Sequence, residues 1–405
     1  MFEVKRRART ARAVANDGRI LDAATALIVT RGVDSFGLRD VAVASGLTYG
    51  ALYGRYEKAP ELLVDLWIHR LGAEIERLVT LSAAAVSSAS MTPEDRQWLT
   101  EPSGDLLAAM QLCIVSTRVE ELADVVPREV KAWFARAAAS DVPGGDPMRL
   151  GIAALLFGAV IVTPVHGCGQ RHISGALGWI HAGVGRRAIT GPAPAPTPAQ
   201  DYDFATDDAA LDALLHAAVD VVARSGLQRA TLKRIGRVAG YSPSVPYAFY
   251  ENREAMLFDV VSRCVEHTRG PEHPVYVGHP EISVASVMSG WSLPESRRYR
   301  RLSLEFLMAA YHDKRLAHVI DDADRMALGG AAAAINPEPS VQHAVITVLE
   351  ASRDIAIGLA LLGDLLDVTV ADWRPFTTAF VDGLAQPDAP TALPSRPDGR
   401  RGRSS

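Results

Sequence analysis

Two segments of the chain place hydroxyl, tyrosine and basic side chains at the same spacing. Each has a basic residue, then a glycine seven residues later, a serine or threonine, and two tyrosines: Arg39, Gly46, Thr48, Tyr53 and Tyr56 in one, and Lys233, Gly240, Ser242, Tyr247 and Tyr250 in the other. Such groups donate hydrogen bonds to phosphate oxygens and base edges. Presented together by short helices, they can bind nucleic acid.

The sequence holds no HExxH, GxSxG, GxGxxG or P-loop motif, so nothing in it points to catalysis. His166, Cys168 and His172 offer imidazole and thiolate groups that suit zinc or copper, but their spacing matches no regular zinc motif. We therefore predict no metal site, no cofactor and no enzyme activity.

The 405 residues are 48% hydrophobic and 22% charged, with a net charge of −5. This composition excludes fibrous and disorder-dominated chains, and the length favours two or three domains. The most apolar run, residues 151–162, is too short for a membrane span of about 20 residues and predicts a buried core helix. No secretory signal is recognised, so we expect a cytoplasmic protein with no membrane partner. The three cysteines, Cys113, Cys168 and Cys264, lie too far apart to suggest a disulfide framework.

The chain repeats itself at an offset of 194 residues. Between residues 20–65 and 214–259, 11 of 46 positions are identical without a gap. Matches continue downstream as far as Trp179 and Trp373. We therefore predict a duplication, with units near 1–190 and 195–384 joined by an extended, proline-spaced linker.

The repeated segment predicts three short helices. In the first unit a helix ends at Arg31-Gly32, a second covers Leu38 to Ala44, and a third runs from a Thr48 cap to about Arg55. The turn at Ser45-Gly46-Leu47 separates the second helix from the third. Helices joined by such a short turn need small residues where they cross. The spacing is that of a helix-turn-helix unit.

Residues 32–63 resemble the DNA-binding segment of TetR-type (tetracycline-repressor-like) regulators, with the pattern Ala-Gly-x-Ser-x-Gly-x-x-Tyr-x-x-Phe-x-x-Lys-x-x-Leu. The first segment reads SGLTYGALYGRY from Ser45, followed by Leu62; the second reads AGYSPSVPYAFY from Ala239, with Arg253 at the lysine position. The resemblance implies an all-α chain of two tandem units, each a three-helix helix-turn-helix domain followed by a helical effector and dimerisation domain.

The predicted boundaries are a basic arm (1–14), a first helix-turn-helix domain (15–62), a first effector domain (63–190), a Pro-rich linker (191–206), a second helix-turn-helix domain (207–256), a second effector domain (257–385) and a disordered tail (386–405). The segment from Arg224 to Arg253 has a charge of +5, whereas the core of the first domain has +1 and its basic residues gather in the arm. Charge taken by segment thus favours nucleic acid, although the total charge does not.

The resemblance and the helix geometry together assign twelve residues to DNA: Arg39, Thr48, Tyr49, Gly50, Tyr53, Lys58, Thr231, Lys233, Ser242, Ser244, Tyr247 and Arg253. Those that open the third helix, Tyr49 among them, are expected in the major groove, and Tyr53, Tyr247 and Arg253 on phosphate oxygens. Arg39 and Lys233, on the second helices, are expected to contact base edges or phosphates. Tyr56 stands at the family's buried Phe position and is expected in the core.

Two departures from the family pattern bear on DNA binding. Ala59 stands at the lysine position of the first unit, with Lys58 beside it. In the second unit Pro243 fits the first helical position after a Ser242 cap, but Pro246 removes a helix hydrogen bond and disfavours a helical residue before it. We predict a short or distorted second recognition helix. These departures also support an alternative, a helical sensor or interaction protein whose headpieces no longer bind DNA specifically.

The amphipathic segments that follow each helix-turn-helix are expected, from the resemblance, to enclose a pocket for an unknown small-molecule effector and to form a four-helix dimer interface. Candidate pocket residues are Trp98, Met110, Trp133, Phe134 and His166, with Met288, Trp291, Met308 and Tyr311 in the second unit. Aromatic and methionine side chains on helices are also typical of a core.

The predicted function is a ligand-released transcriptional repressor that binds a double-stranded DNA operator. The two units are expected to pair within one chain as a pseudo-dimer, with a homodimer also possible. Because the residues at Thr48 to Gly50 differ from those at Ser242 to Ser244, the operator should be asymmetric. An enzyme built on the helical domains is a third, remote alternative.

Overall fold

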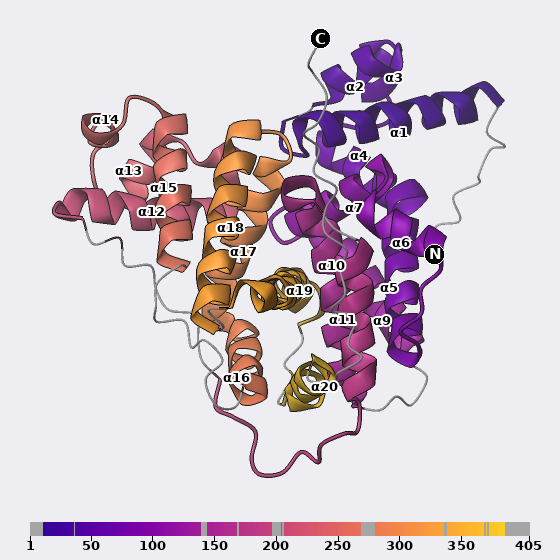
Figure 1. The fold of residues 1–405 in the computed structure, drawn as a ribbon. Coiled ribbons are helices and arrows are strands. Elements are labelled where there is room, and N and C mark those ends of the chain that lie inside the picture. Colours follow the sequence, from indigo (N-terminus) through magenta and orange to yellow (C-terminus); the bar gives the residue numbers. More distant parts are fainter. Residues whose placement is uncertain are drawn as a thin grey trace, which may run out of the picture.

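The computed structural model describes residues 11–384 apart from 36, 139–143, 168–169, 197–203, 205, 269–279, 336–337, 368–369 and 371. All regular secondary structure in these residues is helical, which confirms the predicted fold class. Figure 1 shows the first half of the chain on the right and most of the second half on the left. Residues 1–10 of the predicted arm and the whole predicted tail lie outside the described residues.

Each half begins with a group of short helices that we call a headpiece. The first headpiece (residues 15–62) comprises most of α1 (Ala11–Arg31), then α2 (Leu38–Ser45), α3 (Tyr49–Tyr53) and the start of α4 (Ala59–Leu66). The second headpiece (residues 207–256) comprises α12 (Ala209–Ser225), η2 (Leu227–Arg229), α13 (Leu232–Val238), α14 (Pro246–Phe249) and the start of α15 (Arg253–Thr268). The two headpieces lie at the upper right and upper left of Figure 1.

The remainder of each half is a helical body. The first body contains η1 (Trp67–Leu71), α5 (Gly72–Ser87), α6 (Pro93–Thr100), α7 (Gly104–Val115), α8 (Glu120–Ala123), α9 (Val125–Ala137), α10 (Gly145–His166) and α11 (Gln170–Gly183). The second contains α16 (Pro280–Trp291), η3 (Pro294–Ser296), α17 (Arg297–Ala310), α18 (Lys314–Ile335), α19 (Pro339–Leu366) and α20 (Arg374–Leu384). Hydrophobic residues from both halves form one continuous core.

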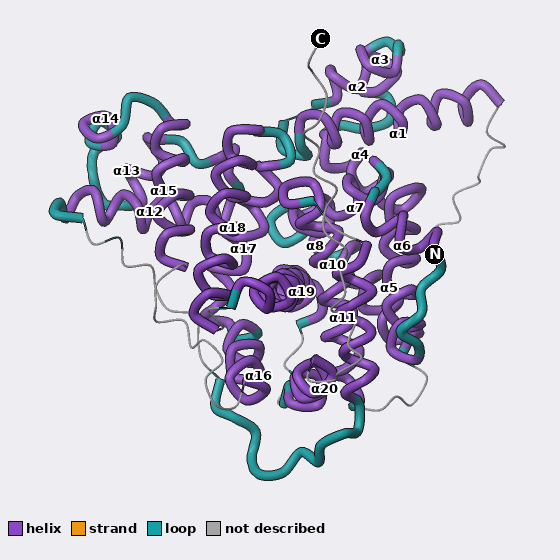
Figure 2. The backbone as a smooth tube through the Cα atoms, in the orientation of Figure 1, coloured by secondary structure: helices purple, strands orange, loops and turns teal. Residues whose placement is uncertain are grey.

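The two bodies meet mainly where α10 packs on α19 and α11 packs on α20, near the centre of Figure 2. A Cβ atom on Gly158 of α10 would lie 1.7 Å from the carbonyl oxygen of Asp354, and one on Gly358 of α19 would lie 1.8 Å from that of Ala154. Only glycine allows two helix backbones to approach this closely. The contact is therefore reciprocal, as in a two-fold symmetric interface.

Helices α11 and α20 repeat this reciprocal contact. Gly183 lies against the carbonyl of Ala379, and Gly383 lies against that of Trp179. In both helix pairs the matching glycines lie 200 residues apart in the sequence. The predicted unbroken offset of 194 is therefore wrong for these helices. The difference of six residues equals the extra length of α19, which spans 28 residues against 22 in α10.

The apolar helix α10 belongs to the protein core. It is long and apolar enough to cross a membrane, but 78% of its most apolar window is buried inside the protein. The prediction of a core helix at residues 151–162 is confirmed. The helix extends beyond those residues at both ends, so its burial, and not its length, excludes a membrane span.

Candidate nucleic-acid interface

The turn between α2 and α3 sets the direction in which α3 leaves the first headpiece. Gly46 has a φ of 64°, a conformation that residues with a Cβ atom rarely adopt. The N–H of Leu47 donates to the carbonyl of Ala42 at 3.0 Å, and Arg19 of α1 donates to the carbonyl of Gly46 at 3.3 Å. Contacts with both preceding helices therefore hold the turn.

The polar residues of α3 and its cap face outward. Thr48, Tyr49, Gly50 and Tyr53 are all exposed. Tyr49 and Tyr53 lie one helical turn apart, with ring centroids separated by 4.0 Å. The hydrogen bond with Tyr53 raises the pKa of Tyr49, so its hydroxyl stays protonated at neutral pH. At Gly50, which has no side chain, a binding partner can approach the backbone closely. The hydroxyl groups of Thr48, Tyr49 and Tyr53 can donate or accept hydrogen bonds on the same face.

The opposite side of α3 packs into the headpiece core. Leu52 is fully buried. Tyr56, which follows the helix, is 9% exposed and donates a hydrogen bond from its hydroxyl to Asp65 at 2.6 Å. Burial and this hydrogen bond raise the pKa of Tyr56. The expectation that Tyr56 belongs to the core is confirmed.

Basic residues flank the exposed face of α3. Arg39 on α2 and Lys58 before α4 are both exposed. Ala59, at the lysine position of the family pattern, is half-buried and packs against the core. Lys58 is therefore the residue at this corner that can reach a phosphate group.

The sequence profile of the bacterial regulatory proteins of the tetR family matches residues 20–64. The match runs from the second half of α1 into α4 and includes the turn and the exposed face described above. Residues 20–64 form a TetR-type helix-turn-helix domain. The family is one of DNA-binding regulators and not of enzymes.

A similar curated protein is the HTH-type transcriptional regulator AqdR of Rhodococcus erythropolis. It is 42% identical over 57 residues, which are 14% of this chain and 28% of AqdR. The alignment thus covers well under half of either protein. The likeness supports the TetR-type domain and leaves the function of the helical bodies to be argued from the structure.

One part-buried hydrogen bond of the TetR-type domain has a counterpart in the second headpiece. Tyr250 is 9% exposed and donates to Asp259 at 2.6 Å. These residues lie 194 positions after Tyr56 and Asp65, which form the same hydrogen bond at the same distance. Burial and the hydrogen bond raise the pKa of Tyr250 as well.

A buried proline distinguishes the second headpiece. Pro246 stands 194 positions after Leu52 and is buried like it. Its ring lies against Gly236, where a Cβ atom would come within 3.1 Å. Pro246 is the first residue of α14, the position where a proline's missing N–H is harmless. Glycine at position 236 gives the ring the room that it needs.

Because it begins at Pro246, α14 has four residues against five in α3. The helix α14 is short, as predicted for this segment, but Pro243 is not its first residue. Ser242 and Ser244 precede the helix, are exposed, and lie 2.8 Å apart through their hydroxyl oxygens. They stand on a turn and not on a helix.

The other predicted contacts of the second headpiece fall into two groups. Lys233 on α13 and Tyr247 on α14 are exposed. Thr231 accepts a hydrogen bond from the N–H of Arg234 at 3.3 Å and caps α13. Arg253 donates to the backbone carbonyls of Ala230 and Leu227, at η2, at 3.0 and 2.6 Å. Its guanidinium therefore holds the headpiece together, and sequence reasoning did not foresee this role.

Exposed basic side chains line η2 and α13 of the second headpiece: Arg229, Lys233, Arg234 and Arg237. In the TetR-type domain, by contrast, Arg31 lies 3.5 Å from Asp40 and Arg55 pairs with Asp17. Unpaired basic groups gain more from replacing counterions on a phosphate backbone. The second headpiece therefore offers the stronger positive surface.

The residues predicted to line an effector pocket pack instead into the helical bodies. Met110, Met288 and Met308 are buried in the core. The aromatic residues contact protein groups: Trp98 lies beside Arg77, Trp133 on Trp67, Phe134 on Phe157, Trp291 donates to the carbonyl of Ala356, and Tyr311 to that of Ile161. These contacts fit core residues better than a shared ligand site.

His166 faces the second half of the chain. Its Nδ1 atom lies 3.1 Å from Asp321 and 3.7 Å from Asp324. Burial, and then the charge of Arg353, lowers the pKa of His166, so the ring is neutral at neutral pH. Cys168 lies outside the described residues, within which no cluster of three possible metal ligands is found.

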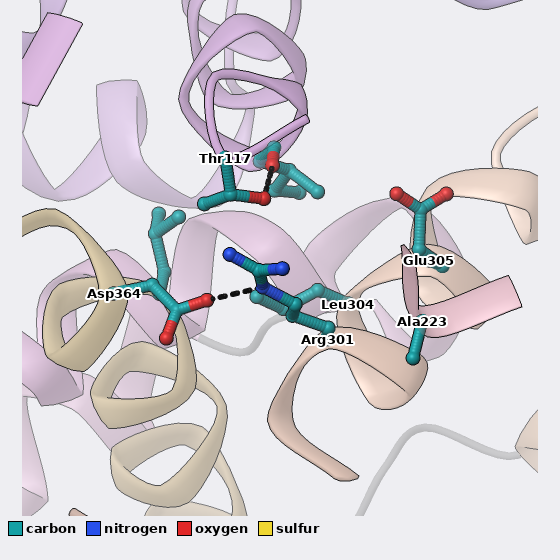
Figure 3. A pocket seen from close by; sticks show the side chains of 8 residues that line it. Thr117, Ala223, Arg301, Leu304, Glu305 and Asp364 are labelled. Carbon is teal, nitrogen blue, oxygen red and sulfur yellow. Dashed lines mark hydrogen bonds and ion pairs between the residues drawn. The ribbon is translucent and has the colours of Figure 1, made fainter. Parts of the chain in front are cut away.

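A small hollow lies where the two halves meet (Figure 3). Its volume is about 10 Å³, room for about one water molecule, and it is lined by Ile114, Thr117, Ala223, Arg301, Leu304, Glu305, Leu361 and Asp364. Small-molecule pockets usually measure about 300–1,000 Å³. None of the predicted pocket residues lines this hollow. Arg301 and Asp364 pair at 2.8 Å on one side of it.

Proposed function

We propose that this protein is a cytoplasmic, sequence-specific DNA-binding transcriptional regulator. The observation that carries the proposal is the exposed face of α3 in the TetR-type domain, where Thr48, Tyr49 and Gly50 open the helix directly after a turn that contacts with α1 and α2 hold in place. A short helix with these groups at its start fits the major groove. Arg39 and Lys58 flank it and would bind phosphate oxygens, which fix the register on the duplex.

We also propose that the second half of the chain is a diverged copy of the first. The repeated Tyr–Asp hydrogen bond supports this, and so does a repeated contact between body and headpiece. The N–H of Val33 donates to Gln111 at 3.2 Å, and the N–H of Leu227 donates to Glu305. Both partners again lie 194 residues apart. Because the hydrogen bonds involve different residue types, the shared geometry does not merely reflect sequence identity.

The two copies would pair within one chain. The reciprocal glycine contacts of α10 with α19 and of α11 with α20 support this pairing. A dimer of identical chains presents two identical headpieces, whereas this pseudo-dimer presents α3 on one side and the shorter α14 on the other. The proposed operator therefore has two unlike half-sites.

The regulator would respond to a small-molecule effector and, as a repressor, would leave the operator when the effector binds. The hollow between the halves is the proposed point of entry, because Thr117, Ala223 and Glu305 come from the first body, the second headpiece and the second body respectively. A ligand of ordinary size must push these elements apart to fit. That movement would favour a headpiece arrangement different from the one that binds DNA.

Selection of bound sequences from a random double-stranded DNA pool tests the proposed function. Wild-type protein should enrich two unlike half-sites at a fixed spacing. Arg39→Ala and Lys233→Ala should each lower the amount of DNA that is bound without changing the selected bases, because both side chains are proposed to contact phosphate oxygens. Arg325→Ala is the matched control, since Arg325 is an exposed arginine on α18 of the body. If no motif is enriched, the regulator proposal fails and the sensor or interaction protein is the better account.

A further inference from the structure

A buried arginine joins the two halves of the molecule. Arg118 follows α7 in the first body, and its side chain is 4% exposed. It donates to Asp34 through two nitrogens, at 2.7 and 2.5 Å, and to Glu305 of α17 at 2.7 Å. Burial lowers the pKa of Arg118, but these carboxylates raise it by more, so the net pKa is above its ordinary value. The guanidinium is therefore charged.

Through these partners Arg118 reaches both headpieces. Asp34 lies in the loop between α1 and α2 of the first headpiece. Glu305 accepts the N–H of Leu227 at the start of η2, in the second headpiece. The guanidinium itself lies against Gly226, where a Cβ atom would come within 2.7 Å of its central carbon. One planar cation thus ties the first loop of one headpiece to the first loop of the other.

The position equivalent to Arg118 in the second half carries an uncharged group. His312 stands 194 residues after Arg118, and its ring lies against Gly32, which is the equivalent of Gly226. Burial lowers the pKa of His312, and its buried Nε2 atom has no hydrogen-bond partner among the described residues. Gln111 stands where the second half has Glu305. Burial raises the pKa of Glu305, and the Arg118 charge opposes this effect. One junction is therefore built from a cation and two carboxyl groups, and the other from neutral groups.

The two junctions differ in how firmly they resist movement. A guanidinium that forms paired hydrogen bonds with a carboxylate has a fixed geometry, and a buried ion pair cannot separate without leaving charges unpaired. The ring of His312 lies against Gly32 and forms a hydrogen bond with the backbone at Thr30, so a neutral hydrogen bond stands where the other junction has ion pairs. The charged junction should therefore act as the fixed point between the headpieces, and the neutral junction should yield first.

We propose that Arg118 is a positioning residue that sets the separation of the two headpieces and, through it, the spacing of the half-sites that the protein accepts. The part that concerns DNA rests on the proposed function. The part that concerns separation does not, because Arg118 contacts both headpieces in the structure without DNA. Lysine cannot take its place, since a single ammonium group cannot bind Asp34 and Glu305 with the same planar geometry.

The separation can be measured directly between two spin labels. Val43 on α2 and Val238 on α13 are 77% and 47% exposed and can be replaced by cysteine in a chain whose own cysteines are changed to alanine. Double electron–electron resonance between the two labels should give one narrow distance distribution when Arg118 is present. Arg118→Lys and Asp34→Asn should broaden it, and Arg118→Ala should broaden it most. His312→Ala, at the neutral junction, should change it least.

Circular dichroism establishes that each variant is folded before its distances are compared. Asp34→Asn keeps the Arg118–Glu305 pair and changes one partly exposed oxygen, so it remains informative if Arg118→Ala does not fold. An unchanged distribution in folded Arg118→Lys and Asp34→Asn would overturn the proposal. So would a larger broadening in His312→Ala than in either of them.

A second arm uses operators whose half-sites are moved apart or together in steps of one base pair. The wild type should prefer one spacing, and Arg118→Lys should accept several with a reduced preference. If the wild type selects no paired half-sites, the proposed function fails while the spin-label experiment still decides the role of Arg118. If the wild type has a fixed spacing that Arg118→Lys retains, the inference fails and the proposed function stands.

Discussion

The two headpieces share a scaffold and differ on the surface that would meet DNA. Both hold a buried tyrosine against an aspartate at 2.6 Å, and both turn from the second helix through a glycine with positive φ. The TetR-type domain then presents a helix with Thr48 and Tyr49 at its start. The second headpiece presents a turn before its helix, with exposed basic residues on α13.

The two surfaces correspond to two ways of binding DNA. A helix that offers hydroxyl groups and a bare backbone at its start can read base edges. Basic side chains on a neighbouring helix bind the phosphate backbone and read little sequence. We expect the TetR-type domain to contribute more of the specificity and the second headpiece more of the salt-dependent affinity.

The largest effect should come from the core positions where the headpieces differ. Leu52→Ala should destabilise the first headpiece by about 2–5 kcal/mol, because it removes a fully buried side chain. Pro246→Ala should cost less, because fewer side-chain atoms are removed and the void left is smaller. Hydrogen exchange of peptides from each headpiece measures the two separately. Equal losses would mean that Pro246 is as essential as Leu52.

A smaller effect should come from the hydroxyl groups at the recognition surfaces. Thr48→Ala should cost about 1–3 kcal/mol at the preferred operator and relax the preference at one base pair. Ser242→Ala should cost less, because its hydroxyl is already bonded to Ser244 on a turn. Fluorescence anisotropy with the selected operator and single-base variants measures both. A larger loss for Ser242→Ala would reverse the assignment of specificity.

The salt dependence of binding sharpens the same comparison. Lys233→Ala should weaken binding to all sequences alike and reduce the slope of log K against log salt by about 1, because one phosphate contact is lost. Thr48→Ala should leave that slope unchanged, since threonine carries no charge. If Lys233→Ala leaves the slope unchanged, Lys233 does not contact the DNA.

The shared scaffold predicts equal effects of a matched pair of substitutions. Tyr56→Phe and Tyr250→Phe should each cost about 1 kcal/mol in local stability, because each removes one hydrogen bond to a part-buried aspartate. Hydrogen exchange again reports on each headpiece. If only Tyr56→Phe has an effect, the second headpiece does not share the framework in solution.

The smallest expected effect concerns pH. Burial lowers the pKa of His312, so the unfolded chain binds a proton more readily than the folded protein does. Stability should therefore be complete above the unfolded pKa of about 6.5 and decrease as the pH falls below it. His312→Asn should reduce this dependence and leave the part that His166 causes. An identical pH profile for the variant would show that burial does not lower the pKa of His312.

The sequence predicted the first headpiece well because its motif is local. The turn glycine, the cap and the tyrosines lie within about a dozen residues and need no distant partner to fix their place. Pro246 likewise predicted a short α14, because a proline restricts the backbone of its own residue and of the residue before it. The packing of Pro246 against Gly236 could not be predicted, because a glycine in the sequence does not indicate which side chain will lie against it.

Features that depend on contacts between distant residues could not be predicted from the sequence. Arg118 meets Asp34 and Glu305 across 84 and 187 residues, and nothing near it marks it as buried. The aromatic and methionine residues predicted to line an effector pocket contact other protein groups in the bodies, and their apolar character suits a core as well as a pocket. The offset of 194 failed in the last helices of each half, where α19 is six residues longer than α10.

Footprinting of the full-length protein on its selected operator tests the central claim most directly, provided that ultracentrifugation establishes how many chains are bound. The account predicts one chain protecting two unlike half-sites, with Thr48→Ala weakening protection in one and Lys233→Ala in the other. A perfect palindrome protected by two chains would contradict it, because each chain would then contribute only its TetR-type domain to the DNA.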